Sequence, residues 1–143
     1  MSITLSDEQW DEVQRVLERL SALAGFKLVL SDLIANWVSF VADCERGYQD
    51  NMDEYINDLG IRIVLQNLVL NTSPSTAEQI STRLDASDRR FIATTTSLDE
   101  PIVQLDHDPN QIEKMLYFRL PRKMHKELES ECQKFRKGGR LWL

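Results

Sequence analysis

The sequence predicts an all-α fold, a bundle of four to five helices. Three stretches, residues 10–24, 26–44 and 122–135, repeat apolar residues at steps of three and four, which places them on one face of a helix. The 143 residues include only five glycines and four prolines, too few for a turn-rich β-sandwich. This length fits one domain, so we expect a single helical domain over residues 1–143 with a short C-terminal tail at 138–143.

The first two helices have clear apolar stripes and clear ends. Ser6 and Gln9 have the spacing of a capping box, so the first helix is predicted to begin at Ser6 and to end at Gly25. Its stripe is Trp10, Val13, Leu17, Leu20 and Ala24. The second helix is predicted from about Lys27 to Arg46. Its broad stripe is Phe26, Leu30, Leu33, Trp37, Phe40 and Cys44, widened by Val29, Ile34, Val38 and Val41, which is typical of a central helix.

The middle of the chain predicts two further helices. Asn51 is expected to start the third, and the β-branched residues 61–65 can be read as a short strand, although the continuing apolar pattern favours helix. Ser73 and Pro74 are typical of the start of a fourth helix, with Ser73 as its cap. Its buried side is predicted to be Ala77, Ile80, Leu84, Phe91 and Ile92, with residues 85–90 as an exposed polar middle.

The last third of the chain leaves one alternative open. Residues 96–109 are expected to form a loop, after which Asp108 and Pro109 can cap a short helix through Met115. Alternatively, residues 115–120 are extended, which the following Pro121 favours. The final helix is predicted from about Arg122 to Arg136, with Met124, Leu128, Cys132 and Phe135 on one side. We expect the apolar tail at residues 141–143 to dock on the body or on a partner.

Sequence patterns argue against membrane insertion, secretion and catalysis. No apolar run approaches the ~20 residues that span a bilayer, and the first residues lack a signal-peptide pattern, so a cytoplasmic location is expected. Cys44 and Cys132 belong to no CxxC pair and are expected to be buried thiols. Motifs for phosphate binding, nucleophilic catalysis and zinc proteolysis are absent. The local cluster around His107 has too few ligands for a metal site, so we expect no catalytic residues, metal or cofactor.

The strongest functional signal is an acidic stretch between the second and third helices. It contains six carboxylates against the single cation Arg46. Tyrosines lie among the carboxylates, and aromatic side chains anchor protein interfaces while charge steers a basic partner. The predicted partner-binding residues are therefore Asp43, Glu45, Tyr48, Asp50, Asp53, Glu54, Tyr55 and Asp58. The alternative is a solvated corner that keeps the protein in solution.

The C-terminal segment has the opposite charge. Residues 119–143 hold eight Lys and Arg against three Asp and Glu, whereas residues 1–118 hold nine against 20. The basic residues are Arg119, Arg122, Lys123, Lys126, Lys134, Arg136, Lys137 and Arg140, interleaved with Tyr117, Phe118, Phe135 and Trp142. This pattern suggests nucleic acid or an acidic protein as a partner. Against it stand the pI of about 4.9 and three glutamates in the same segment, so an exposed or internally paired helix is the alternative.

Three segments resemble small bacterial proteins, some of which are similar to immunity proteins of toxin-delivery systems. The segments are residues 55–59, residues 84–95, and residues 117–121 together with Glu127 and Leu128. They cover about a quarter of the chain, and residues 115–118 stand where such proteins often carry a Trp-rich stretch. The resemblance implies binding to a cognate toxin, often a nuclease, whose active site or substrate groove is blocked.

Together these observations predict a non-enzymatic immunity protein or inhibitor. Its expected partner is a cognate protein toxin with a basic surface, rather than nucleic acid or a membrane, and the 43–58 carboxylates would mimic a polyanionic substrate. The alternative is a regulatory or adaptor module that uses the basic C-terminal segment. A third possibility is an enzyme whose site is assembled from scattered carboxylates.

Overall fold

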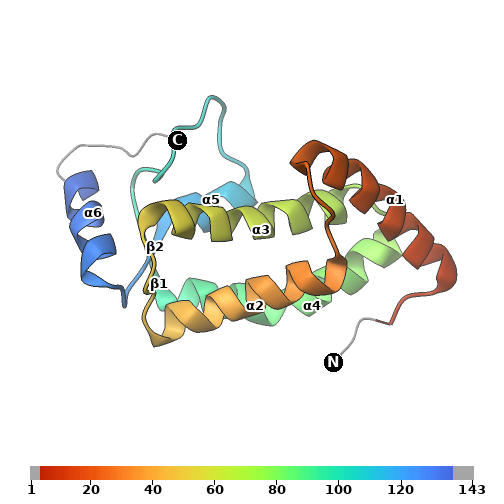
Figure 1. Cartoon of the computed structure of the whole chain (residues 1–143), viewed down its shortest axis with the longest axis horizontal. Helices are drawn as coiled ribbons and strands as arrows, with labels where there is room; N and C mark the ends of the chain where they lie inside the picture. Colours follow the sequence, from red (N-terminus) through yellow and green to blue (C-terminus); the bar gives the residue numbers. More distant parts are fainter. Residues whose placement is uncertain (1–3, 137–143) are drawn as a thin grey trace.

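The computed structural model describes residues 4–136, which form a helical bundle (Figure 1). The all-α prediction is confirmed, because the described residues form six helices and only a small two-stranded sheet. The elements are α1 (Asp7–Ala24), α2 (Leu30–Arg46), α3 (Met52–Leu70), α4 (Pro74–Thr94), β1 (Thr95–Ser97), α5 (Gln111–Tyr117), β2 (Arg119–Pro121) and α6 (Lys126–Arg136). Residues 61–65 are part of α3, as the apolar pattern favoured.

Local capping chemistry sets the first helix boundaries. Ser6 and Gln9 form the predicted capping box, in which the Ser6 hydroxyl accepts from the Gln9 N–H at 3.2 Å and the Gln9 side chain accepts from the Ser6 N–H at 2.9 Å. Asn51 caps α3 by accepting from the N–H of Glu54 at 3.0 Å. Helix α2 begins at Leu30, later than the predicted Lys27, because Val29 is still extended.

The core lies between α2, α3 and α4, which pack side by side, while α1 crosses one end of α3 (Figure 1). Five aromatic side chains form its centre: Trp37, Phe40, Tyr48, Tyr55 and Phe91. Their neighbouring ring centroids are 5.3–6.0 Å apart in tilted or edge-to-face arrangements, a geometry that stabilises aromatic pairs beyond their buried area. The second helix is therefore central, as its broad stripe predicted.

The predicted apolar stripes are nevertheless too wide. Phe26 is 66% exposed because it lies in the connection before α2 rather than on the helix. Trp10, Val29, Val38 and Ile92 are also exposed. A helix buries only the residues that face its neighbours, so apolar residues at the edges of a stripe remain in contact with solvent.

Both alternatives for residues 110–120 are partly correct. A short helix, α5, runs to Tyr117, and the chain then becomes extended in β2. Strand β2 pairs antiparallel with β1, with Thr95 opposite Pro121, so the predicted loop at 96–109 starts with a strand. Asn110, not Asp108, caps α5, because its side chain accepts from the N–H of Glu113 at 2.9 Å.

The final helix begins at Lys126 rather than at Arg122, because the preceding backbone pairs with another segment. The N–H of Tyr48 donates to the carbonyl of Lys123 at 2.9 Å, and the N–H of His125 donates to the carbonyl of Tyr48 at 2.7 Å. These bonds form a parallel bridge between the α2–α3 connection and the segment before α6. Distant parts of the sequence therefore meet at one end of the bundle.

A buried ion pair joins the three central helices. The Arg62 guanidinium of α3 donates to both oxygens of Asp88 of α4, at 3.0 and 2.9 Å, and the indole N–H of Trp37 of α2 donates to the same carboxylate at 3.0 Å. The Arg62 side chain is only 7% exposed and that of Asp88 16%. The prediction that residues 85–90 form an exposed polar middle is therefore wrong at Asp88, and also at Ser87, which is 5% exposed.

The start of α4 is capped by a residue from another helix. Ser73 is the N-cap and Pro74 follows it, as predicted, but the Ser73 side chain makes no capping bond of its own. Instead, the Glu12 carboxylate of α1 accepts from the N–H and hydroxyl of Ser73 and from the Thr76 hydroxyl. Burial acts to raise the pKa of Glu12, but these hydrogen bonds, with the charge of Arg15, outweigh it and lower the pKa overall.

We expect Glu12→Gln to lower the thermal midpoint at neutral pH, because the neutral amide is a weaker acceptor for these three donors. The Glu12 pKa is depressed in the folded state, so its stabilisation is fully present above the unfolded value of about 4.5 and is lost as the pH falls through the folded value. Thermal melts of both proteins at neutral and acidic pH test this. Curves that stay equally far apart at both pH values would contradict it.

The two cysteines are buried, as expected. Burial, assisted by neighbouring carboxylates, raises the pKa of the Cys44 thiol to about 12, which keeps it protonated. None of the helices within residues 4–136 is long and apolar enough to cross a membrane. The predicted tail at 138–143 and the Phe135 side chain lie outside the described part of the chain.

Candidate functional site

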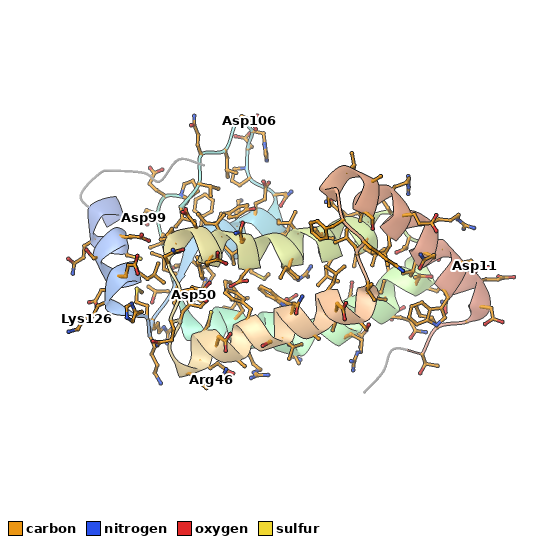
Figure 2. All side chains as sticks on the ribbon, in the orientation of Figure 1. Asp11, Arg46, Asp50, Asp99, Asp106 and Lys126 are labelled. Atoms are coloured by element: carbon orange, nitrogen blue, oxygen red, sulfur yellow. The ribbon has the colours of Figure 1, made fainter. Side chains whose placement is uncertain are left out.

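The candidate site is the junction between α2 and α3. Gly47 ends α2 with a φ of 119°, a conformation that side chains rarely adopt, and its N–H donates to the carbonyl of Asp43. The chain then turns into Tyr48 and reaches the start of α3 within a few residues. Arg46 and Asp50 lie at this end of the bundle, near Lys126 of α6 and far from Asp11 of α1 (Figure 2).

Three of the predicted carboxylates act on a fourth, Asp58, at this junction. Burial first, and then the charges of Glu54, Asp50 and Asp43, raise the pKa of Asp58. The four residues come from α2, the connection and α3, so the fold has gathered them. We call Asp43, Asp50, Glu54 and Asp58 the acidic patch. Asp53 is exposed next to Glu54 in the first turn of α3 and borders this patch.

Glu45 does not belong to the acidic patch. Its carboxylate forms a two-pronged ion pair with the guanidinium of Arg90 on α4. The hydrogen bond from Arg90 is the main cause of a lowered pKa of Glu45 and of a raised pKa of Arg90. Glu45 therefore links α2 to α4 through this pair, and its role as a partner-binding carboxylate stays a prediction.

The two tyrosines are not surface anchors, so that prediction is wrong. Tyr48 is 1% exposed and Tyr55 is fully buried. Their rings fill the space beside Phe40, and each hydroxyl has a partner: Tyr48 donates to Asp58 at 2.7 Å, and Tyr55 donates to the carbonyl of Arg119 at 2.8 Å. A buried phenol needs such a partner, and these positions satisfy it inside the protein.

Tyr48 nevertheless contributes to the site, because its buried ring carries a hydroxyl that reaches the acidic patch. Its hydroxyl donates to the half-buried Asp58 carboxylate, on which the negative charges of Glu54, Asp50 and Asp43 also act. That hydrogen bond favours the ionised form of Asp58 and opposes the effect of burial on its pKa. Burial and the same bond raise the pKa of Tyr48, which stays a neutral donor. The bond therefore fixes the position of the Asp58 carboxylate at the edge of the core.

The start of α3 beside the acidic patch is also held by a residue of α6. The N–H of Met52, the first residue of α3, donates to the Glu131 carboxylate of α6 at 2.9 Å. Glu131 thus adds one more negative charge at the end of the bundle where Asp50 and Lys126 lie (Figure 2). Sequence reasoning missed it, because Glu131 and Met52 meet only through the tertiary fold.

The acidic patch offers hydrogen-bond acceptors and negative charge. Among the described residues, no three His, Cys, Asp or Glu side chains are placed to hold a metal ion. Arg46, the cation of this stretch, is exposed and already paired with Asp43. What the surface can do is attract and hydrogen-bond cationic groups.

Searches of protein families, curated proteins and solved structures find no match to this chain.

The basic C-terminal segment is only partly on the surface. The Arg119 side chain donates to the Thr95 hydroxyl at 2.7 Å and to the carbonyls of Thr95 and Ile92, both at 3.1 Å, so it holds the β1–β2 pair together. Arg122, Lys123 and Lys126 are exposed. The remaining basic side chains lie outside the part that the structure describes. The described basic surface is therefore smaller than the sequence count suggests.

Proposed function

We propose that this chain is a non-enzymatic binding protein of the immunity-protein kind. It captures a basic protein partner, a cognate toxin, through the acidic patch and inhibits it in the bacterial cytoplasm. The observation that carries the proposal is the convergence of Asp43, Asp50, Glu54 and Asp58 at one junction, where the charges of the first three act on the Asp58 carboxylate. A solvated corner needs no such gathering, since dispersed charges keep a protein in solution equally well.

Electrostatic capture is supported by the charge balance of the chain. Residues 1–118 hold 20 Asp and Glu against nine Lys and Arg. Surfaces of one charge sign raise association rates with an oppositely charged partner by about 10–10³-fold. Asp50 and Glu54 are exposed, and the Asp43 side chain is 49% exposed although it pairs with Arg46, so these carboxylates can meet lysines and arginines of a partner without a change of fold.

The rigid base of the acidic patch supports specific binding in addition to steering. Asp58 is held by Tyr48, which in turn packs against Phe40 and Tyr55. A carboxylate whose position is fixed before binding loses less conformational freedom when it meets a guanidinium or ammonium group. Tyr48 and Tyr55 thus serve the proposed interface as its buried support, and not as contact residues.

The kind of partner follows from the resemblance to immunity proteins and from the charge. A nuclease binds a polyanion, so its substrate groove carries lysines and arginines that neutralise phosphates. A surface with several closely spaced carboxylates matches such a groove. The proposed inhibition is occlusion: the acidic patch occupies the groove and excludes the substrate.

The test reverses Asp50, Asp53 and Glu54 to lysine in one variant. A matched control reverses Asp7, Glu8 and Asp11, which changes net charge equally and also places two lysines in the first turn of a helix. Asp11 and Asp50 lie at opposite ends of the bundle (Figure 2). Circular dichroism of both variants checks that they remain helical.

The partner to be used is the cognate toxin that we expect to be encoded beside this chain. We expect the patch variant to bind it at least tenfold more weakly and to lose protection in a growth assay, whereas the control variant binds and protects. A folded patch variant that still binds and protects like the unchanged protein would refute the proposal. A gene neighbourhood of regulators without any toxin would also count against it.

A further inference from the structure

The first half of the loop between β1 and α5 is held by backbone hydrogen bonds. The N–H of Leu98 donates to the carbonyl of Phe118 at 2.7 Å, and that of Ile102 donates to the carbonyl of Tyr117 at 2.8 Å. Ile102 and Val103 are buried in the core. Residues 104–110 then lead to α5. They are exposed except for Leu105, which packs against the core, and the partly buried Pro109, and Figure 2 labels Asp106 in this stretch.

A histidine ties the second half of the loop to α5. The His107 Nε2 lies 2.9 Å from Oε2 and 3.0 Å from Oε1 of Glu113, and its Nδ1 lies 2.8 Å from the Asp106 carboxylate. Glu113 is only 8% exposed, and it also accepts from the N–H of Asn110 at 3.1 Å, which completes the cap of α5. One carboxylate therefore serves both the loop and the first turn of the helix.

An imidazole with an acceptor on each side is satisfied at both nitrogens only when it carries two protons. The neutral ring has one N–H and one lone pair, so one of its two carboxylate contacts must lose its donor. The hydrogen bond with Asp106, and then that with Glu113, raise the pKa of His107. The two hydrogen bonds and the two carboxylate charges thus both favour the protonated form of His107.

We propose that His107 is a pH-sensitive clasp, which holds residues 104–110 on α5 when it is protonated and loosens them when it is neutral. The stabilisation is fully present below the unfolded histidine value of about 6.5 and is lost as the pH rises through the higher folded pKa. Neutral His107 can still donate one hydrogen bond to Glu113, whereas the exposed Asp106 turns away. Because charge-assisted bonds are roughly twice as strong as neutral ones, deprotonation weakens the clasp and does not open it fully.

The effect should extend into α5, because a helix of seven residues is too short to be stable without its packing and caps. Asp108 and Lys114, the chain neighbours of His107 and Glu113, are exposed. Tyr117 feels the charge of Glu113, which adds to burial in raising the pKa of its phenol. Within the described residues, α3 packs on α5 but places no charged side chain in hydrogen-bond or ion-pair contact with His107 or Glu113.

The test follows the His107 ring and the backbone amides by NMR from about pH 5 to about pH 9, a range that brackets the histidine titration. Amide hydrogen exchange, corrected for its intrinsic pH dependence, reports the opening of residues 104–113. We expect the His107 midpoint to lie above 6.5 and the protection of these amides to fall several-fold through that midpoint. His125→Gln, which removes the other histidine, should keep the same profile.

Two variants separate the clasp from other causes. His107→Ala should show low protection of residues 104–113 at every pH, with no step in this range. Glu113→Gln keeps an acceptor but removes the charge, so the His107 midpoint should fall. The proposal is overturned if protection does not change while His107 titrates, or if His107→Ala keeps the pH step of the unchanged protein.

Discussion

Replacing Asp88 by alanine should lower the free energy of unfolding by about 3–5 kcal/mol, the usual cost of removing one partner of a buried ion pair. The substitution leaves the Arg62 guanidinium, 7% exposed, without its carboxylate, and leaves the indole N–H of Trp37 without an acceptor. These groups belong to three different helices, so the loss affects the packing of the whole bundle.

Urea denaturation followed by circular dichroism measures the effect. Asp85→Ala is the matched control, because Asp85 is exposed on the same helix and its loss should change stability by less than about 0.5 kcal/mol. Adding Arg62→Met to Asp88→Ala removes the unpaired charge and should restore part of the loss. Equal, small effects of Asp88→Ala and Asp85→Ala would show that the ion pair does not hold the helices together.

The second large expected effect is the loss of folding stability when Tyr48 or Tyr55 is truncated. If they were surface anchors, truncation would speed dissociation from the partner and leave the fold intact. Because both rings are buried, we expect Tyr48→Ala and Tyr55→Ala each to cost about 3–5 kcal/mol of folding stability, as for other large aromatic residues in cores. Tyr48→Phe keeps the ring and loses only the bond to Asp58, for about 1 kcal/mol.

Denaturation of the three variants, together with toxin binding by Tyr48→Phe, checks this account. Tyr48→Phe should remain folded and should retain the carboxylates that meet the partner, so its association rate should stay close to that of the unchanged protein. A Tyr48→Ala protein of normal stability that releases its partner faster would contradict the buried position of this ring.

The helices could be predicted from the sequence because their signals are local. Ser6 and Gln9, or Asn51 and Glu54, lie within one turn of each other, and the apolar stripe of α2 repeats within the helix itself. The choice between helix and strand for residues 110–120 stayed open, because local signals alone do not decide it. The pairing of β2 with β1 depends on a strand far away in the chain.

The site was predicted only in part, because charge is visible in a sequence and burial is not. The carboxylates of the acidic patch were found by composition, but the role of Tyr55 was misjudged. Its spacing of three from Met52 and four from Leu59 places it on the buried stripe of α3. Asp88 carries the same signal, four residues after Leu84 and three before Phe91. A polar residue on an apolar stripe therefore indicates a buried partner, here Arg62.

The most direct measurement of the proposed function is the rate of association with the toxin at two ionic strengths. The Debye length is about 30 Å at 0.01 M salt and about 8 Å at 0.15 M, so steering by the acidic patch should weaken strongly between them. We expect the association rate of the unchanged protein, and of the Asp7, Glu8 and Asp11 control, to fall by tenfold or more over this range. The Asp50, Asp53 and Glu54 variant should associate slowly at both. Identical rates and salt dependence for the patch variant and the control variant would contradict capture through the acidic patch.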